Sequence, residues 1–115
     1  MKIYQYPKCS TCRKAIKYLN ENNFVFEIVD ISQQQPSLAE IQQMLKSQGE
    51  IKKLFNTSGV QYRELDIKNK LPTLKDQEAI ELLAKNGMLI KRPFLIGKNI
   101  ALLGFKEAIW KEAFK

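Results

Sequence analysis

The chain has 115 residues, of which 44% are hydrophobic and 27% charged, and these values indicate one folded globular domain rather than a disordered chain. It contains no histidine, which excludes Cys–His and Ser–His nucleophile pairs and histidine-rich metal sites. The 19 basic and 12 acidic residues give a net charge of +7, but no run or motif gathers the basic residues, so direct nucleic-acid binding is disfavoured.

The N-terminal part has the pattern of a strand, a helix and a second strand. Residues 3–6 are β-branched or aromatic except for one glutamine, and Pro7 ends this strand. Residues 10–22 place their apolar side chains on one helical face. Residues 24–30 are apolar almost throughout, which is typical of a strand covered on both faces, as in a parallel sheet.

Residues 32–86 predict helices and no further strand. A capping box formed by Ser37 and Glu40 begins a helix that runs to about Ser47. We expect the apolar face of this helix to consist of Leu38, Ile41 and Leu45.

Two short helical stretches, at 51–55 and 62–67, separate this helix from the last helix of the region. Thr73 with Asp76 can open that last helix. Asn86 with Gly87 predicts its end in a left-handed cap.

The C-terminal part predicts a hairpin and a helix. Residues 94–97 and 100–104 are short apolar strands, and Lys98 with Asn99 forms the turn between them. The helix that follows packs through one face, for which we expect Phe105, Ala108, Ile109, Glu112 and Ala113. The order of elements predicts an α/β protein of thioredoxin-like fold, with a mixed four-stranded sheet in a single domain, 1–115, and an inserted helical subdomain at about 32–86.

Cys9 and Cys12 form a C-x-x-C pair between the first strand and the first turn of the first helix. The unpaired N–H groups and the dipole of a helix N-terminus favour negative charge, so we expect Cys9 to ionise more easily than a free thiol. Lys8 and Arg13 add positive charge on either side. Cys12, one turn further along, can resolve a mixed disulfide on Cys9 or close an internal disulfide with it. This placement favours a redox-active pair.

Two other interpretations of the cysteines stay open. Both can be small buried hydrophobic side chains. The pair can also be half of a zinc site shared across a dimer, since a closed site within one chain lacks two ligands.

The compartment bears on this choice. The first residues lack the apolar stretch of a secretory signal, and no apolar run approaches the ~20 residues of a membrane helix. We therefore expect a cytoplasmic protein without membrane contact. Cysteines stay reduced there, and they are more often catalytic or redox-sensing than structural.

Arg92, followed by Pro93, is the second candidate feature. Residues 1–23 and 84–104 each carry a net charge of +4, and Arg92 lies in the second of these stretches. If Pro93 is cis, the bend holds the chain close to Cys9, and Arg92 meets the thiolate or an anionic substrate. The alternative is a trans proline that ends a loop beside a solvated arginine. The segment 56–59 can donate hydrogen bonds to an anion, or it is simply a turn.

The residues around these features resemble the ArsC/Spx family. The matching segments, in the order of the family, are 6–15 (YPKCSTCRKA), 54–59 (LFNTSG), 87–93 (GMLIKRP) and 104–106 (GFK). The resemblance covers essentially the whole chain and is strongest to a small arsenate-reductase-like branch. It implies a thioredoxin-like fold, a redox-active Cys9, and Arg92 facing it before a cis Pro93. It also implies glutathione, a glutaredoxin or a thioredoxin as the reductant, and no bound cofactor.

The chain departs from the arsenate reductases of this family, which are coupled to glutaredoxin. Those enzymes use three arginines around the cysteine, and the matching positions here hold Asn56, Arg92 and either Phe105 or Lys106. Loss of two of three donors weakens the stabilisation of a bound oxyanion. The Spx regulators of the family carry a C-x-x-C redox switch and bind RNA polymerase.

We therefore expect a thiol–disulfide oxidoreductase with a redox disulfide between Cys9 and Cys12. Cys9 attacks, Cys12 resolves, and Arg92 orients an anionic substrate, with glutathione as a candidate co-substrate. The alternative is a redox-sensing transcriptional regulator that binds the RNA polymerase alpha subunit, and the third hypothesis is arsenate reduction proper. We expect no metal site, and we expect further substrate contacts from Lys8, Ser10, Thr11, Arg13, Asn56 and Pro93.

Overall fold

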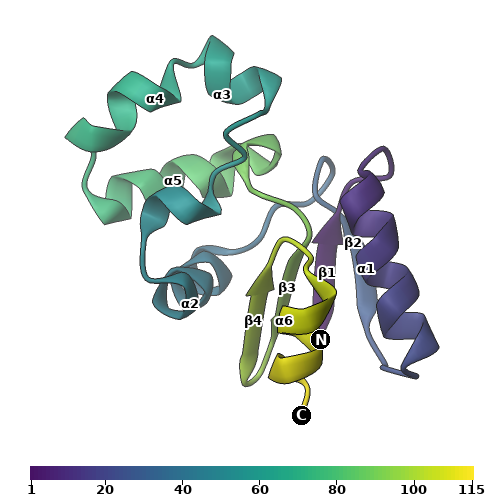
Figure 1. The fold of residues 1–115 in the computed structure, drawn as a ribbon. Coiled ribbons are helices and arrows are strands. Elements are labelled where there is room, and N and C mark those ends of the chain that lie inside the picture. Colours follow the sequence, from purple (N-terminus) through teal and green to yellow (C-terminus); the bar gives the residue numbers. More distant parts are fainter.

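The computed structural model describes residues 1–115 and contains four strands in one mixed sheet, with helices on both faces (Figure 1). The sheet has the order β2-β1-β3-β4, in which β1 pairs in parallel with β2 and antiparallel with β3. The predicted mixed sheet is confirmed. Its elements are β1 (Lys2–Gln5), α1 (Ser10–Glu21), β2 (Glu27–Asp30), α2 (Leu38–Gln48), the 3-10 helix η1 (Ile51–Leu54), α3 (Val60–Glu64), α4 (Ile67–Lys70), η2 (Leu71–Thr73), α5 (Asp76–Lys85), η3 (Gly87–Leu89), β3 (Phe94–Gly97), β4 (Ile100–Leu103) and α6 (Glu107–Ala113).

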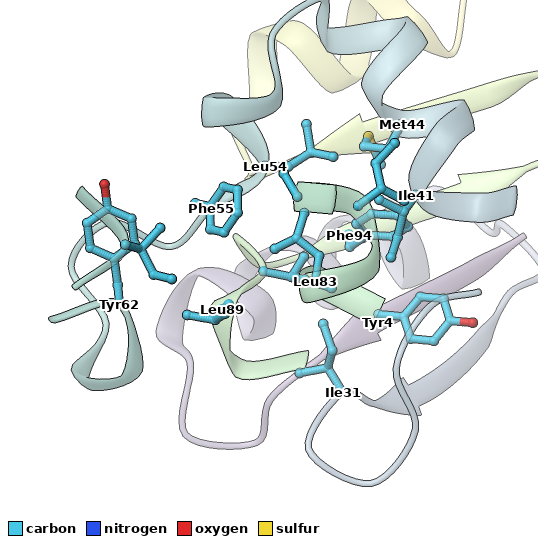
Figure 2. Packing of buried hydrophobic residues seen from close by; sticks show 14 of the residues in the cluster. Tyr4, Ile31, Ile41, Met44, Leu54, Phe55, Tyr62, Leu83, Leu89 and Phe94 are labelled. Atoms are coloured by element: carbon cyan, nitrogen blue, oxygen red, sulfur yellow. The ribbon is translucent and has the colours of Figure 1, made fainter. Parts of the chain in front are cut away.

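Alternation along the strands sends neighbouring side chains into two separate cores. Ile3 and its cross-strand partner Leu95 point to the face that α1 and α6 cover, where they pack with Trp110. Tyr4 and its partner Phe94 point to the other face, where the helices between β2 and β3 bury them, as Figure 2 shows. One hydrophobic core therefore contains side chains of both the sheet and the inserted helices.

A polar network ties β1 to the first inserted helix. The buried Tyr4 hydroxyl donates a 2.7 Å hydrogen bond to the Glu40 carboxylate, and Lys2 forms a 3.0 Å ion pair with the same group. Ser37 and Glu40 form the predicted capping box. Burial raises the pKa of Glu40, but hydrogen bonds from Ser37, Tyr4 and Lys2 outweigh burial and hold that pKa below its ordinary value.

The second strand differs from its prediction, because β2 lies at an edge of the sheet. Only Val29 is buried in it, while Ile28 is 52% exposed and Val25, just before it, is 90% exposed. A continuous apolar run is thus not covered on both faces here. The opposite edge is covered: Gln43 and Ser47 of α2 donate hydrogen bonds to carbonyl groups of the hairpin β3–β4.

Two helix faces differ from the prediction as well. In α2, Met44 is buried with Ile41, whereas Leu38 in the first turn is 44% exposed. In α6, the buried side chain is Trp110, and Ile109 is 55% exposed. Both helices turn by about one residue relative to the expected face, because the sheet and not the helix periodicity decides which side is covered.

The ends of α5 also differ. The Thr73 hydroxyl donates to the Lys70 carbonyl group rather than capping α5, which begins at Asp76. Asn86 has φ −136°, so the helix does not end in a left-handed cap. Gly87 is needed for a different reason, since a Cβ there would overlap the carbonyl oxygen of Ile31.

No helix of the structure has the length and hydropathy needed to cross a membrane. No group of three or more His, Cys, Asp or Glu side chains comes together in a way that could hold a metal ion.

Candidate active site

Cys9 occupies the N-cap position of α1, directly after the loop that leaves β1. Its backbone is extended, with φ −93° and ψ 111°, and its Sγ accepts a hydrogen bond of 3.3 Å from the backbone N–H of Cys12. A sulfur atom therefore takes the place that the oxygen of a serine or aspartate fills at other helix starts. The sulfur thus lies at the end of α1 where the first backbone N–H groups point.

Cys12 lies one turn further along and is fully buried, whereas Cys9 is half-buried. Both are free thiols in the structure. Burial, followed by a hydrogen bond with the Cys9 side chain, raises the pKa of the Cys12 thiol to about 12. The two thiols thus face each other, and only Cys9 is placed to meet a molecule arriving from solvent.

Arg92 reaches the same site from the other half of the chain. The peptide bond between Arg92 and Pro93 is cis, which the sequence left open. The positive charge of Arg92 acts on Cys12 and opposes the rise in the pKa of Cys12 that burial causes. The guanidinium group lies 5.5 Å from the centre of the Tyr6 ring and donates to the Met88 carbonyl group.

The other residues expected at the site have different surroundings. Arg13 donates a hydrogen bond of 3.0 Å to the Pro7 carbonyl group and so braces the loop before Cys9. Lys8 and Ser10 are exposed. Thr11, which lies between the two cysteines in the sequence, lines a cleft together with Arg92, but neither cysteine lines it. Pro93 is buried, and its carbonyl group accepts from the Gly104 N–H.

That cleft has a volume of about 520 Å³ and runs between the inserted helices and the sheet half of the molecule. Its lining includes Gln48 and Lys53 from the inserted segment, and Thr11, Arg92 and Lys106 from the rest of the chain. The sequence did not single out Lys53, because nothing in its local pattern tells which way the insertion turns it.

Asn56 lies in a neighbouring cavity of about 420 Å³ that does not include Arg92. The chain around Phe55 forms an antiparallel bridge with Ile90, and the Asn56 N–H donates to the Leu89 carbonyl group. Asn56 therefore lines a cavity that adjoins the cleft of Arg92, since Lys53 and Lys91 line both.

The family model described as "ArsC family" matches residues 4–113. The chain belongs to the ArsC family.

Individual relatives of the ArsC-family chain cover nearly its full length. It is 45% identical over 111 residues to the uncharacterized protein YusI of Bacillus subtilis, and the alignment covers 96% of this chain and 94% of YusI. The crystal structure of a possible arsenate reductase from Streptococcus mutans UA159 is 42% identical, covers 96% of this chain and 95% of its own, and superposes with a TM-score of 0.88. The global transcriptional regulator Spx of Listeria innocua is 28% identical over 91% of this chain and 79% of its own length.

The resemblance to arsenate reductases matched the third arginine position with either Phe105 or Lys106, and the structure shows where these two side chains lie. The Phe105 ring packs against Trp110 with centroids 4.9 Å apart, so it is part of the aromatic core under the cleft. Lys106, the next residue, lines the cleft together with Arg92. This member of the ArsC family thus combines one arginine with three lysines in the cleft that Thr11 and Arg92 line.

Proposed function

We propose that the protein is a thiol–disulfide oxidoreductase of the ArsC family in which Cys9 attacks and Cys12 resolves. The observation that carries this proposal is the difference between the two thiols: Cys9 is half-buried at a helix N-cap, and Cys12 is fully buried beside it. Its substrate is a disulfide with an anionic group that Arg92 binds.

The first step forms one sulfur–sulfur bond and breaks another. The Cys9 thiolate attacks a substrate disulfide, a mixed disulfide forms on Cys9, and the other half of the substrate leaves as a thiolate. The hydrogen bond from the Cys12 N–H helps Cys9 carry negative charge before the attack.

The second step depends on a change at Cys12. Burial is the largest cause of the raised pKa of Cys12, and the hydrogen bond and charge of Cys9 add to it, while Arg92 acts in the opposite direction. Once Cys9 is held in a mixed disulfide, the contribution of Cys9 disappears and that of Arg92 remains. Cys12 then loses its proton more readily, attacks Cys9 Sγ and releases the substrate thiolate, which takes up a proton.

The cycle closes when a reductant returns two electrons to the Cys9–Cys12 disulfide. Two glutathione molecules, or the dithiol of a glutaredoxin or thioredoxin, supply these electrons and are themselves oxidised to a disulfide. No bound cofactor or metal takes part in these steps.

Mass spectrometry of two matched variants tests the assignment. After incubation with oxidised glutathione, Cys12→Ser protein should carry one stable glutathione adduct on Cys9, and the wild type should lose two hydrogens as the internal disulfide forms. Cys9→Ser protein should show neither product. An adduct on Cys12 in that variant, at a rate similar to the wild type, would overturn the assignment of roles.

A second candidate function is a redox-sensing regulator, favoured by the similarity to the regulator Spx over 91% of this chain. In that case the same cysteine pair changes a surface that binds the RNA polymerase alpha subunit. Trapping with tagged Cys12→Ser protein in a cell lysate separates the two candidates. Clients that only a reductant releases support the enzyme, whereas polymerase retained in the presence of reductant supports the regulator.

Arsenate reduction is less well supported by the geometry. Arg92 and Lys106 line the cleft, but the other matching positions hold no cation: Asn56 lines the adjoining cavity, and Phe105 is an apolar part of the cleft lining. We expect glutathione- and glutaredoxin-coupled arsenate turnover close to background, and turnover well above background would restore this function to first place.

A further inference from the structure

The cleft beside the cysteine pair carries an unusual concentration of unpaired positive charge. Four cationic residues line it and no acidic residue does; they are Lys53, Lys91, Arg92 and Lys106. None of them forms an ion pair; the three ion pairs of the molecule are formed by Lys2, Lys17 and Lys115. Such a cleft attracts a ligand with several negative charges.

Part of the lining of the same cleft is apolar. Leu103 and Phe105 are half-buried there and Ile109 is 55% exposed, whereas Leu102 and Trp110 are buried. A small inorganic anion would leave this apolar surface open to water. A ligand with apolar groups next to its carboxylates would cover it.

The positive charge continues beyond the cleft. Lys53 and Lys91 line both this cleft and the cavity of about 420 Å³ that contains Asn56, where Lys52 adds a further cation and Glu50 is the one acid. The ligand that fits both spaces is therefore extended.

Lys91 is held between the two spaces by the backbone. Its side chain lies across Gly104, where an added Cβ would stand 3.1 Å from Lys91 Cε. Gly104 has φ +70°, a conformation that favours glycine, and its N–H donates to the Pro93 carbonyl group. The loop that positions Arg92 thus also positions Lys91.

The aromatic side chains argue against a nucleic acid as this ligand. Stacking of bases requires free ring faces. The Trp110 ring is 1% exposed and packs edge-on against Phe105, so it offers no such face.

We propose that this cleft docks an extended acidic segment of a protein partner, with carboxylates on Lys53, Lys91 and Lys106 and an apolar side chain over Ile109. The proposal builds on the proposed function, because the docked segment would present its disulfide to Cys9. It gives the inserted helices a role in recognition: they supply one wall of the cleft.

A binding measurement without thiol chemistry tests the docking itself. The probe is a short fluorescein-labelled peptide of alternating glutamate and leucine that contains no cysteine, and its fluorescence anisotropy is followed on titration with the full chain. The cleft variant carries Lys53→Gln, Lys91→Gln and Lys106→Gln. The matched control carries Lys46→Gln, Lys75→Gln and Lys98→Gln, three exposed lysines outside the cleft. Both triple variants lose the same charge.

We expect the cleft variant to bind the peptide about tenfold more weakly than the wild type, since each exposed ion pair contributes roughly a factor of two. The control should stay within about twofold of the wild type. Ile109→Ser, at an exposed position, should weaken binding further without loss of folding.

Four outcomes would overturn the proposal. Equal weakening in both triple variants would mean that only the overall charge attracts the peptide. Equal binding of a peptide with lysine in place of glutamate would mean that the charge of the ligand is not recognised. Cleft-dependent self-association, or cleft-dependent binding of a labelled oligonucleotide with no peptide binding, would assign the cleft to another occupant. Because the probe has no cysteine, peptide binding can persist while thiol exchange on Cys9 fails, and then only the proposed function falls.

Discussion

The raised pKa of Cys12 predicts a large difference in reactivity between the two cysteines. With a pKa of about 12, Cys12 is a thiolate in about one molecule in a hundred thousand at pH 7, whereas an ordinary thiol is a thiolate in a few per cent. Iodoacetamide reacts with the thiolate, and burial, the largest cause of the raised pKa, remains when Cys9 is replaced. Cys12 in Cys9→Ser protein should therefore be alkylated at least about a hundredfold more slowly than an exposed thiol.

The assay compares Cys9→Ser with Cys12→Ser protein by mass spectrometry at neutral pH. Native Cys12→Ser protein, whose remaining thiol is half-buried at the helix N-cap, should be labelled readily. In guanidinium chloride the two variants should react at similar rates, which isolates the contribution of the fold. If native Cys9→Ser protein reacts within about tenfold of its denatured rate, burial does not protect Cys12 and the division of roles fails.

The same shift has a consequence for stability. Between the ordinary value of 9.0 and the raised value, the folded state keeps a proton on Cys12 that the unfolded chain has released. The free energy of unfolding therefore falls as the pH rises above 9, by about 1.4 kcal/mol per pH unit. Cys12→Ala protein, denatured under reducing conditions, should lack this part of the slope. Parallel slopes for the two proteins would contradict the buried thiol.

Three further predictions concern the frame around the site, and chemical denaturation measures each. Tyr4→Phe should lower the free energy of unfolding by about 2 kcal/mol, because the buried Tyr4 hydroxyl donates a hydrogen bond to the Glu40 carboxylate. Tyr18→Phe is the control, because the Tyr18 hydroxyl makes no hydrogen bond, and it should change the free energy little. Similar losses in the two variants would contradict a stabilising role of the Tyr4–Glu40 hydrogen bond. Because the pKa of Glu40 is lowered in the folded state, the ionised Glu40 stabilises the fold fully above pH 4.5, the ordinary pKa, and this stabilisation is lost as the pH falls through the lowered pKa. The free energy of unfolding should therefore depend less steeply on acid pH in Glu40→Gln protein than in the wild type. Gly87→Ala should cost about 2 kcal/mol or more through overlap with backbone, against about 1 kcal/mol for Gly49→Ala, which has φ +88° but open space around it; a reversed order would contradict the packing.

The parts of the site that the sequence predicts are those that depend on local signals. A proline after a short strand, a cysteine at the next helix start and a second cysteine one turn later place the thiols without knowledge of the rest of the chain. The capping box of Ser37 and Glu40 fixes the start of α2 in the same way. The burial of segment 24–30 could not be predicted from its own residues, since an apolar run has the same sequence pattern at the edge of a sheet as at its centre. Only the strand order shows that Ile28 stays open to solvent.

The partners of Arg92 depend on the register between two distant segments. Leu54 accepts a hydrogen bond from the Lys91 N–H, and Asn56 donates one to Leu89, so the two segments run in opposite directions. Arg92 therefore lies three residues along the chain from Leu89, the residue that Asn56 faces. The same register brings the residue before Leu54 toward Arg92. An anion bound at Arg92 is then within reach of Lys53 rather than Asn56, which is why a cation supplied by the insertion lines the cleft beside the cysteine pair.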